Sequence, residues 1–335
     1  MSSVDVYVPC YNYARFLPDA VHSVLSQEGV TVRVLILDDA SSDDSEAVGR
    51  RLAAADPRVE YRRHETNHGH IATYNEGIDW LAGDYCLLLS ADDMLLPGAL
   101  ARAAAVMDAH SDVVITHGQA IETQHPDSLA HPLVAGPEVT IQTGSDFIRS
   151  RCVAGHNLVA CSTAIGRSRC QKLIGHYRRE LPHSGDMEMW LRFAEHGSIA
   201  YLHAHQALYR RHDGNMSHGY RGARDLWQIK LAFDSFFDHA ARPLPDAAEL
   251  RHVVAASLER HAFEHAYQAF VEGDTAAFAD IKRFVRAVAP RCRYTARWLG
   301  LHMKQRIGIR AVNRAKKYRE WIRRTTRGVH HGAKT

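Results

Sequence analysis

The sequence lacks any long apolar run. Its longest candidate, residues 85–91, is only as long as a strand, whereas a helix that crosses a bilayer needs about 20 apolar residues. The N-terminus shows no basic region followed by an apolar stretch and a small-residue cleavage site, so we expect no secretory signal. These absences argue against a multi-span membrane protein and favour a cytoplasmic location.

Cysteine pairs are absent too. None of the six cysteines forms a Cys-x-x-Cys motif, and a cytosolic protein with free thiols is the simplest interpretation. Apolar residues make up 46% of the chain and charged residues 24%, which is near the average for soluble globular proteins. A chain of 335 residues with this composition is long enough for one large domain or two moderate ones.

Charge is distributed unevenly along the chain. Residues 291–335 carry 14 Lys and Arg against a single acid, Glu320, so their net charge is +13. The rest of the chain therefore carries −10, although the whole has only +3. An acidic body with a basic tail predicts an electrostatic role for the tail.

Strands and helices are predicted to alternate through the first third of the chain. Apolar, β-branched runs predict strands at 4–9, 31–37, 59–64, 85–90 and 113–117. Helical spacing of apolar residues predicts helices at 15–27, 44–55, 71–81 and 97–110. This alternation is typical of an α/β protein with a mostly parallel sheet and helices on both faces.

The pattern is less regular further along. We expect a loop at 125–142, a helix at 185–196 and two strands at 199–203 and 207–211. The chain then becomes helical from about residue 220.

Two acidic pairs follow predicted strands, Asp38-Asp39 and Asp92-Asp93. In sheets of this kind ligands bind beyond the carboxyl ends of the strands. Two carboxylates at such an end suit Mg²⁺ or Mn²⁺, which take further ligands from substrate phosphates. The alternative for Asp93 is a turn or a helix cap before Pro97.

Two more acidic positions have both a chemical and a structural interpretation. Asp39 is suited to accept a hydrogen bond from a uracil imide or a ribose hydroxyl, or it forms a cap with Ser41 and Ser42. Ser42 or Asp43 is the expected cap of the following helix. Asp186, at a predicted helix start, is either a general base or an N-cap.

Five segments occur in an order that resembles the family-2 glycosyltransferases with a GT-A fold. They are VYVPCYNYARFLPDAVHSVLSQ, LILDDASSDDS, NHGHIATYNEGIDWLAGDYCLLLSADDMLLPGAL, GDMEMWLR and YRRHDGNMS. The resemblance covers residues 1–218, which would form a GT-A type doubly wound catalytic domain. A helical extension at 219–290 and a basic helical tail at 291–335 would follow.

The resemblance implies a nucleotide-sugar site. By position, Pro9, Tyr11 and Asp39 resemble the residues that hold the nucleotide base. Asn67 and Asn75 match family positions that line the nucleotide cleft; a turn and a helix cap are the alternative.

The resemblance also implies the metal and catalytic residues. Asp92 would lie near the ribose, Asp93 on the metal and His212 near the metal or diphosphate, while Asp186 resembles the catalytic base. Two positions depart from the family pattern: the acidic motif reads Ser-Ala-Asp-Asp rather than Asp-Ala-Asp, and Gly185 stands where Glu is frequent.

The function that the resemblance implies is transfer of one sugar, with inversion, to a glycan or lipid-linked saccharide. UDP is the expected nucleotide, with a dTDP-sugar as the alternative, and the cofactor is Mg²⁺ or Mn²⁺. The QxxRW motif of processive synthases is absent. Two other functions compete with this one: a non-catalytic nucleotide-sugar-binding module and a sugar nucleotidyltransferase. A nucleotidyltransferase would have a glycine-rich loop after its first strand, but this chain has residues 9–13 there instead.

The basic tail has three interpretations. Its aromatic and basic residues suit an anionic membrane surface, an anionic acceptor, or solvent. Nucleic acid is not expected, because no recognition motif accompanies the charge.

Overall fold

A computed structural model describes residues 1–124, 135–241, 244 and 246–308. The chain forms two compact units. The first contains residues 1–220 and 228–250, and the second contains residues 221–227 and, among those described, 251–308. In the described ranges no helix is long and apolar enough to span a bilayer.

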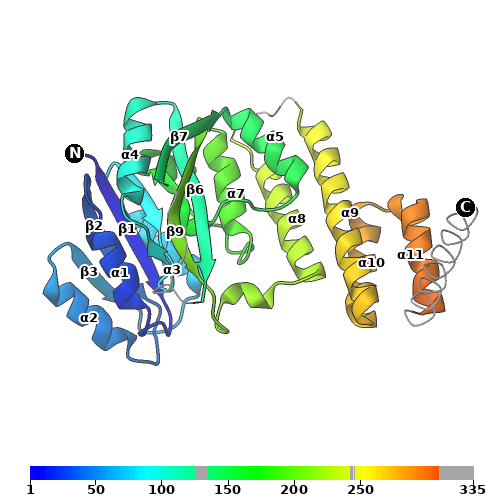
Figure 1. Ribbon diagram of the computed structural model, residues 1–335, viewed down its shortest axis with the longest axis horizontal. Coiled ribbons are helices and arrows are strands. Elements are labelled where there is room, and N and C mark those ends of the chain that lie inside the picture. Colours follow the sequence, from blue (N-terminus) through cyan, green and yellow to red (C-terminus); the bar gives the residue numbers. More distant parts are fainter. Residues whose placement is uncertain (125–134, 242–243, 245, 309–335) are drawn as a thin grey trace, which may run out of the picture. The chain divides into compact units, whose positions relative to one another are not determined.

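The first unit is built on one sheet (Figure 1), to which the described residues contribute nine strands. The strands are β1 (Ser3–Cys10), β2 (Thr31–Asp38), β3 (Val59–Arg63), β4 (Tyr85–Leu88), β5 (Met94–Leu95), β6 (Val113–Thr123), β7 (Ala135–Gln142), β8 (Ile165–Arg167) and β9 (Ser198–Arg210). Their order is β3-β2-β1-β4-β8-β6-β9-β5, with β7 paired to β9.

The sheet is mostly parallel, as the sequence predicts. β1 pairs in parallel with both β2 and β4, β2 pairs so with β3, and β6 pairs so with β9, while β5, β7 and β8 run antiparallel to their neighbours. β2 and β3 lie on one side of β1 and β4 on the other. The side on which the chain adds successive strands therefore reverses between β1 and β4, and such a switch point is where sheets of this kind bind ligands.

The described residues also form eleven α-helices. They are α1 (Leu17–Leu25), α2 (Ser45–Ala55), α3 (His70–Trp80), α4 (Ala99–Ala109), α5 (Gly144–Ala154), α6 (Ser168–Ile174), α7 (Gly185–Ala194), α8 (Ala223–Asp238), α9 (Ala247–Glu272), α10 (Thr275–Val288) and α11 (Ala296–Ile307). The predicted helical C-terminal region is thus confirmed for the described residues.

Three sequence predictions about elements were wrong. Residues 135–142, expected in a loop, form strand β7, because their backbone pairs with β9; residues 125–134 of that expected loop lie outside the described part. The two short strands expected at 199–203 and 207–211 are one continuous strand, β9. Helix α2 has Asp44 at its N-cap without a side-chain cap bond, so neither Ser42 nor Asp43 occupies that position.

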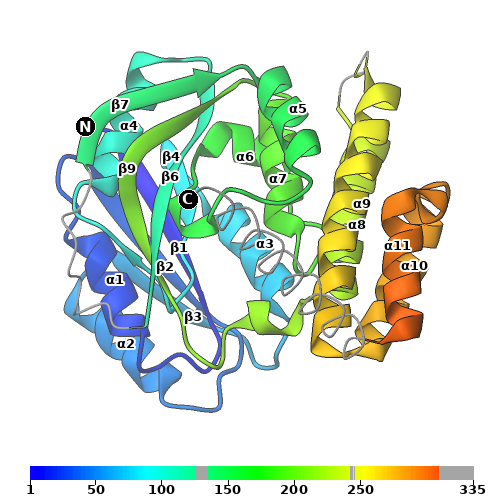
Figure 2. The ribbon, with the colours of Figure 1, turned by 45° about the vertical axis from the view of Figure 1, so that its right-hand side comes forward.

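Helices cover both faces of the sheet (Figure 2). Apolar residues of α1, α2 and α4 share a buried core with the strands, including Leu17, Val48 and Met107. Helix α3 packs against β1, and α6 packs against both α3 and α7.

The approach of α3 to β1 depends on Gly77. A Cβ atom at this position would lie 2.2 Å from Cδ2 of Tyr7, whose ring is buried. Only a residue without a side chain fits between the helix and the strand.

Replacing Gly77 by alanine should therefore lower the free energy of unfolding by about 2 kcal/mol, because the added methyl group overlaps the Tyr7 ring. Urea or thermal denaturation followed by circular dichroism measures this change. Gly300 in α11 is the matched control, because nothing lies within 4 Å of its Cβ position. Gly300→Ala should not destabilise the protein, since alanine favours helix. Equal stability of Gly77→Ala and the parent would contradict the close packing.

Candidate active site

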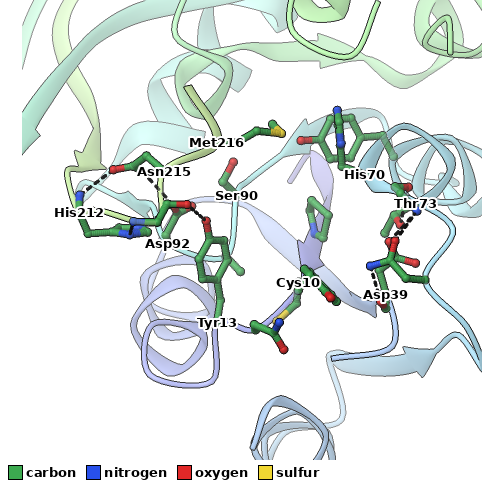
Figure 3. Close-up of a pocket in the computed structure, with 18 of the residues that line it drawn as sticks. Cys10, Tyr13, Asp39, His70, Thr73, Ser90, Asp92, His212, Asn215 and Met216 are labelled. Carbon is green, nitrogen blue, oxygen red and sulfur yellow. Dashed lines mark hydrogen bonds and ion pairs between the residues drawn. The ribbon is translucent and has the colours of Figure 1, made fainter. Parts of the chain in front are cut away.

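A cleft of about 640 Å³ opens at the carboxyl ends of the strands (Figure 3). Its wall is formed by the segments that follow β1, β2, β4 and β9, and by the start of α3. The lining residues include Pro9, Tyr11, Tyr13, Asp39, Asn67, Tyr74, Ser90, Asp92, His183, Tyr209, His212 and Asn215. The cleft thus lies at the switch point of the sheet, between β1 and β4, as expected for a ligand site in this fold.

Asn12 ties together the loops after β1 and β2. Its backbone is in the left-handed region, with φ at 60°, and its side-chain oxygen accepts hydrogen bonds from the amides of Ser42 (2.8 Å) and Asp43 (3.3 Å). Its own amide donates to Ser41 Oγ at 2.9 Å. These hydrogen bonds fix the backbone beside Pro9 and Tyr11.

Asp39 lines the cleft and holds the loop that leads into α3. Its Oδ1 accepts from the amide of His68 at 2.7 Å, and its Oδ2 accepts from the amide of Gly69 at 2.8 Å. The side-chain amide of Asn67 donates to the Asp39 carbonyl at 3.2 Å. Asp38 does not line the cleft; it is fully buried and accepts from the Tyr61 hydroxyl and the Ser41 amide.

Asp92 is the carboxylate that faces the cleft from the second acidic pair. Its Oδ2 lies 3.0 Å from His212 Nε2 and 3.3 Å from Asn215 Nδ2. The Tyr13 phenol also approaches this carboxylate (Figure 3), and burial together with the charge of Asp92 raises the pKa of the phenol. The Gly214 amide donates to His212 Nδ1 at 3.1 Å, so in the neutral ring Nε2 carries the hydrogen and donates to Asp92.

Asp93 is not among the residues that line the cleft. Its Oδ1 accepts from the Arg210 amide at 3.1 Å, and the residue is 3% exposed. Burial and the adjacent charge of Asp92 raise the pKa of Asp93 to about 8. Two carboxylates held this way repel each other, and a cation nearby would relieve that repulsion.

Asp186 lies in the first turn of α7, with Ser184 at the N-cap position, so it is not the cap itself. Its Oδ2 accepts from Asn157 Nδ2 at 2.8 Å, and its Oδ1 accepts from the Met187 amide at 2.7 Å. Burial raises the pKa of Asp186 to about 6. Asp186 is not among the cleft-lining residues, but its charge and that of Asp92 both contribute, after burial, to raising the pKa of Tyr74, which does line the cleft.

The structure thus brings most of the residues singled out from the sequence to one place. Pro9, Tyr11, Asp39, Asn67, Asp92 and His212 all line the cleft. Asn75 does not: its side chain exchanges hydrogen bonds with the backbone of Tyr177, at 2.7 and 3.0 Å. This geometry favours a structural role for Asn75.

Three residues of the site were not predicted from the sequence. Asn215 binds Asp92 and also accepts from the His212 amide at 2.6 Å; its place in the YRRHDGNMS segment is a signal for it. Tyr13 belongs to the loop after β1, whose aromatic residues are another signal. Asn157, the partner of Asp186, has no local sequence signal, because only the tertiary fold brings it there.

The residues of the site were tested for their fit to a divalent cation, as the sequence predicts one. Among the described residues, no cluster of three or more His, Cys, Asp or Glu side chains could hold a metal by itself. Asp92 offers a hard oxygen ligand, and the buried charge of the Asp92–Asp93 pair favours a cation. Mg²⁺ in proteins commonly takes one or two carboxylates and completes its shell with water and substrate phosphates.

Comparison with known families identifies the chain. A model of the family described as glycosyl transferase family 2 matches residues 5–170. The chain belongs to this family. It is therefore a glycosyltransferase, as the five segments predict.

Curated relatives carry related names. EpsE of Bacillus subtilis, a glycosyltransferase by name, is 26% identical over 62% of this chain and 72% of its own length. ExoO of Rhizobium meliloti, a succinoglycan biosynthesis protein, is 37% identical over 32% of this chain and 30% of its own. The GalNAc(5)-diNAcBac-PP-undecaprenol beta-1,3-glucosyltransferase of Campylobacter jejuni is 33% identical over 30% of this chain and 33% of its own.

Solved structures share the fold. S. aureus TarS in complex with UDP-GlcNAc superposes with a TM-score of 0.64 at 19% identity, over 86% of this chain and 82% of that one. A mannosyltransferase from Pyrobaculum calidifontis, in complex with GDP-Man and Mn²⁺, gives 0.56 at 15% identity, over 90% and 86%. The GT-A fold predicted from the sequence is confirmed.

Replacing Asp93 by asparagine should stabilise the metal-free protein near pH 8 by about 1 kcal/mol or more, because the amide removes a buried charge beside Asp92. The pKa of Asp93 is raised from 3.8 to about 8 in the folded state, so the folded state holds a proton that the unfolded chain releases. The contribution of protonated Asp93 to the stability of the parent is therefore fully present below about pH 4, and it is lost as the pH rises through about 8.

Thermal denaturation in EDTA at several pH values tests this. The difference between Asp93→Asn and the parent should vanish below about pH 4. Asp79→Asn is the control, because Asp79 is exposed at the surface, where it pairs with His176. A variant less stable than the parent near pH 8 would show that Asp93 is stabilised as the anion.

Proposed function

We propose that this glycosyltransferase moves a single sugar, with inversion, from a UDP-sugar to a hydroxyl group of a saccharide acceptor. The observation that carries this proposal is the cleft at the sheet switch point: Asp39 and Asp92 both line it, and the charge of Asp186 acts on Tyr74 in its wall. TarS, which shares the fold, was solved with UDP-GlcNAc, which supports a UDP donor. A dTDP-sugar is the alternative donor.

The nucleotide would bind along the first two strand ends. Pro9 and Tyr11 offer an apolar and aromatic wall for the base. Asp39 and Asn67, which follow β2 and β3, offer polar groups for the base edge or the ribose. The pyrophosphate would then extend toward Asp92. A Mg²⁺ or Mn²⁺ ion held there would act as a Lewis acid that stabilises the charge of the departing diphosphate.

The sequence places Asp93 on the metal, and we propose instead that Asp92 is the carboxylate that binds it. Asp92 faces the cleft, whereas Asp93 binds the Arg210 amide and lies outside the lining. His212 orients Asp92 through its Nε2 hydrogen; direct coordination by Nε2 would require the other tautomer and loss of the Gly214 bond. His212 as a ligand stays a prediction from the sequence.

Asp186 has the properties of the general base. Asn157 and the Met187 amide orient its carboxylate, and burial tunes its pKa to about 6. A carboxylate with a pKa near the working pH accepts a proton from an acceptor hydroxyl and is largely ionised at pH 7. Attack from the face opposite the leaving diphosphate would invert the anomeric centre.

Replacing Asp186 by asparagine should lower the rate of sugar transfer about 1,000-fold, because no base remains to accept the proton. UDP affinity, measured by calorimetry with Mg²⁺, should stay at the parental value and serves as the control for folding. In the parent, the transfer rate should rise with pH through about 6 and level off above it, because Asp186 must lose its proton. Near-parental turnover of the variant would remove Asp186 from the mechanism.

The names of two relatives support a proposal for the acceptor class. One relative's name specifies an undecaprenol-linked saccharide, and another is a succinoglycan biosynthesis protein. We infer a glycan or lipid-linked saccharide acceptor for this chain, used at the cytoplasmic face of the cell membrane.

Helix α11 in the second unit supports contact with a membrane surface. Leu299, Met303 and Ile307 lie at four-residue spacing and are 48–63% exposed, opposite the buried residues Trp298 and Leu301. Helical geometry places Arg306 on one side of this apolar stripe and Lys304 on the other. Residues 309–335, outside the described part, add nine Lys and Arg against one acid. Apolar and basic residues in this arrangement suit an anionic bilayer surface.

Full-length protein should sediment with vesicles that contain phosphatidylglycerol, and less so at high salt. Replacing Leu299, Met303 and Ile307 together by serine should weaken this binding about tenfold or more, because the apolar contact is lost. Leu173→Ser is the matched control, since Leu173 is 69% exposed on α6 of the first unit. If the triple variant bound vesicles as tightly as the parent, the α11 surface would not be the contact.

A further inference from the structure

His64 bridges two carboxylates behind the nucleotide end of the cleft. Its Nδ1 lies 2.8 Å from Asp39 Oδ1, and its Nε2 lies 2.8 Å from Glu76 Oε2. The His64 side chain is only 9% exposed, whereas that of Glu76 is 35% exposed. The bridge therefore joins the end of β2, the residue after β3 and helix α3.

The geometry of this bridge requires a protonated ring. A carboxylate only accepts hydrogen bonds, so each ring nitrogen of His64 must donate. A neutral imidazole has one N–H group and one lone pair, and the lone pair would face a carboxylate oxygen at 2.8 Å. With both carboxylates ionised, only the imidazolium form satisfies both contacts.

The surrounding charges act in the same direction. Burial lowers the pKa of His64, but the hydrogen bonds and charges of Asp39 and Glu76 outweigh this and raise the pKa above its ordinary value of 6.5. The His68 ring stacks on His64 at 4.5 Å. Arg62 lies 3.5 Å from Glu76 and Arg63 pairs with Asp38 and Glu46, so these cations are balanced by carboxylates.

The bridge supports the residues that face the cleft. Oδ1 of Asp39 receives both the His64 ring and the His68 amide, and Oδ2 receives the Gly69 amide. Asn67 and Gly69, in the loop between His64 and α3, line the cleft. Loss of the contact to Glu76 would free one end of the bridge and loosen this loop against α3.

We propose that His64 is a positioning residue for the nucleotide and that its protonation makes nucleotide binding sensitive to pH. This inference rests on the proposed nucleotide-sugar function. Below the pKa of His64 the bridge is complete and the Asn67–Gly69 loop is held for binding. As the pH rises through that pKa, the ring loses a proton, the contact to Glu76 is lost and nucleotide affinity falls.

Calorimetric titration of the full-length protein with UDP and Mg²⁺ tests this between about pH 6 and about pH 8.5. UDP affinity of the parent should fall about fivefold over this range, which corresponds to the loss of one charged hydrogen bond. His64→Gln should bind weakly with little pH dependence, because it carries no charge. His64→Arg should bind tightly throughout, because the guanidinium keeps its charge and can donate to both carboxylates.

His176→Gln is the matched control, since His176 pairs with Asp79 on the surface, where the side chains are 51% and 67% exposed. It should keep the parental pH profile. A parental profile in His64→Gln would overturn the proposal, as would pH-independent UDP binding by the parent.

Two outcomes separate this inference from the proposed function. If the parent bound no UDP at any pH, both the nucleotide-sugar function and the role of His64 would fail. If the parent bound UDP with no alkaline loss, only the role of His64 would fail. Nitrogen-15 NMR of the ring gives an independent answer: at pH 6.5, the ordinary pKa of histidine, more than half of the rings should carry a proton on both nitrogens, and a predominantly neutral ring there would overturn the proposal.

Discussion

The repulsion between two adjacent buried carboxylates is the constraint around which the site is organised. Asp92 and Asp93 are 7% and 3% exposed, so water screens their charges poorly. The fold offsets this with donors: the Arg210 amide serves Asp93, while His212 and Asn215 serve Asp92. These donors come from the end of β9 and the segment after it, and β9 pairs there with β5, which begins directly after Asp93.

The two acidic pairs, Asp38-Asp39 and Asp92-Asp93, are arranged in the same way. In each pair one carboxylate faces the cleft and the other turns inward: Asp39 and Asp92 line it, while Asp38 and Asp93 bind groups of the protein. Asp38 and Asp39 stand at the end of β2, whereas Asp92 and Asp93 lie between β4 and β5, so the two pairs reach the same arrangement from different local backbones. Asp38 and Asp93 thereby hold the backbone beside the carboxylate that lines the cleft.

Much of the fold was predictable because its signals are local. The apolar strands β1, β2 and β4 and helices α1 to α4 have the period of their structure written in consecutive residues. Strand β7 was missed because the stretch containing it is rich in proline and glycine, and its pairing partner β9 lies more than 50 residues away. The continuity of β9 was missed for a similar reason: its register against β6 includes irregularities that interrupt a simple apolar pattern.

The sequence by itself determined the family, the α/β class and the carboxylates around which the site is built, because these depend on segments of consecutive residues. Only the tertiary structure decided which member of each acidic pair faces the cleft. It also decided that Asn75 serves Tyr177, that Asn157 holds Asp186, and that His64 joins Asp39 to Glu76. These contacts join residues between 12 and 102 positions apart, and their directions are set by sheet order and helix packing, which no local pattern specifies.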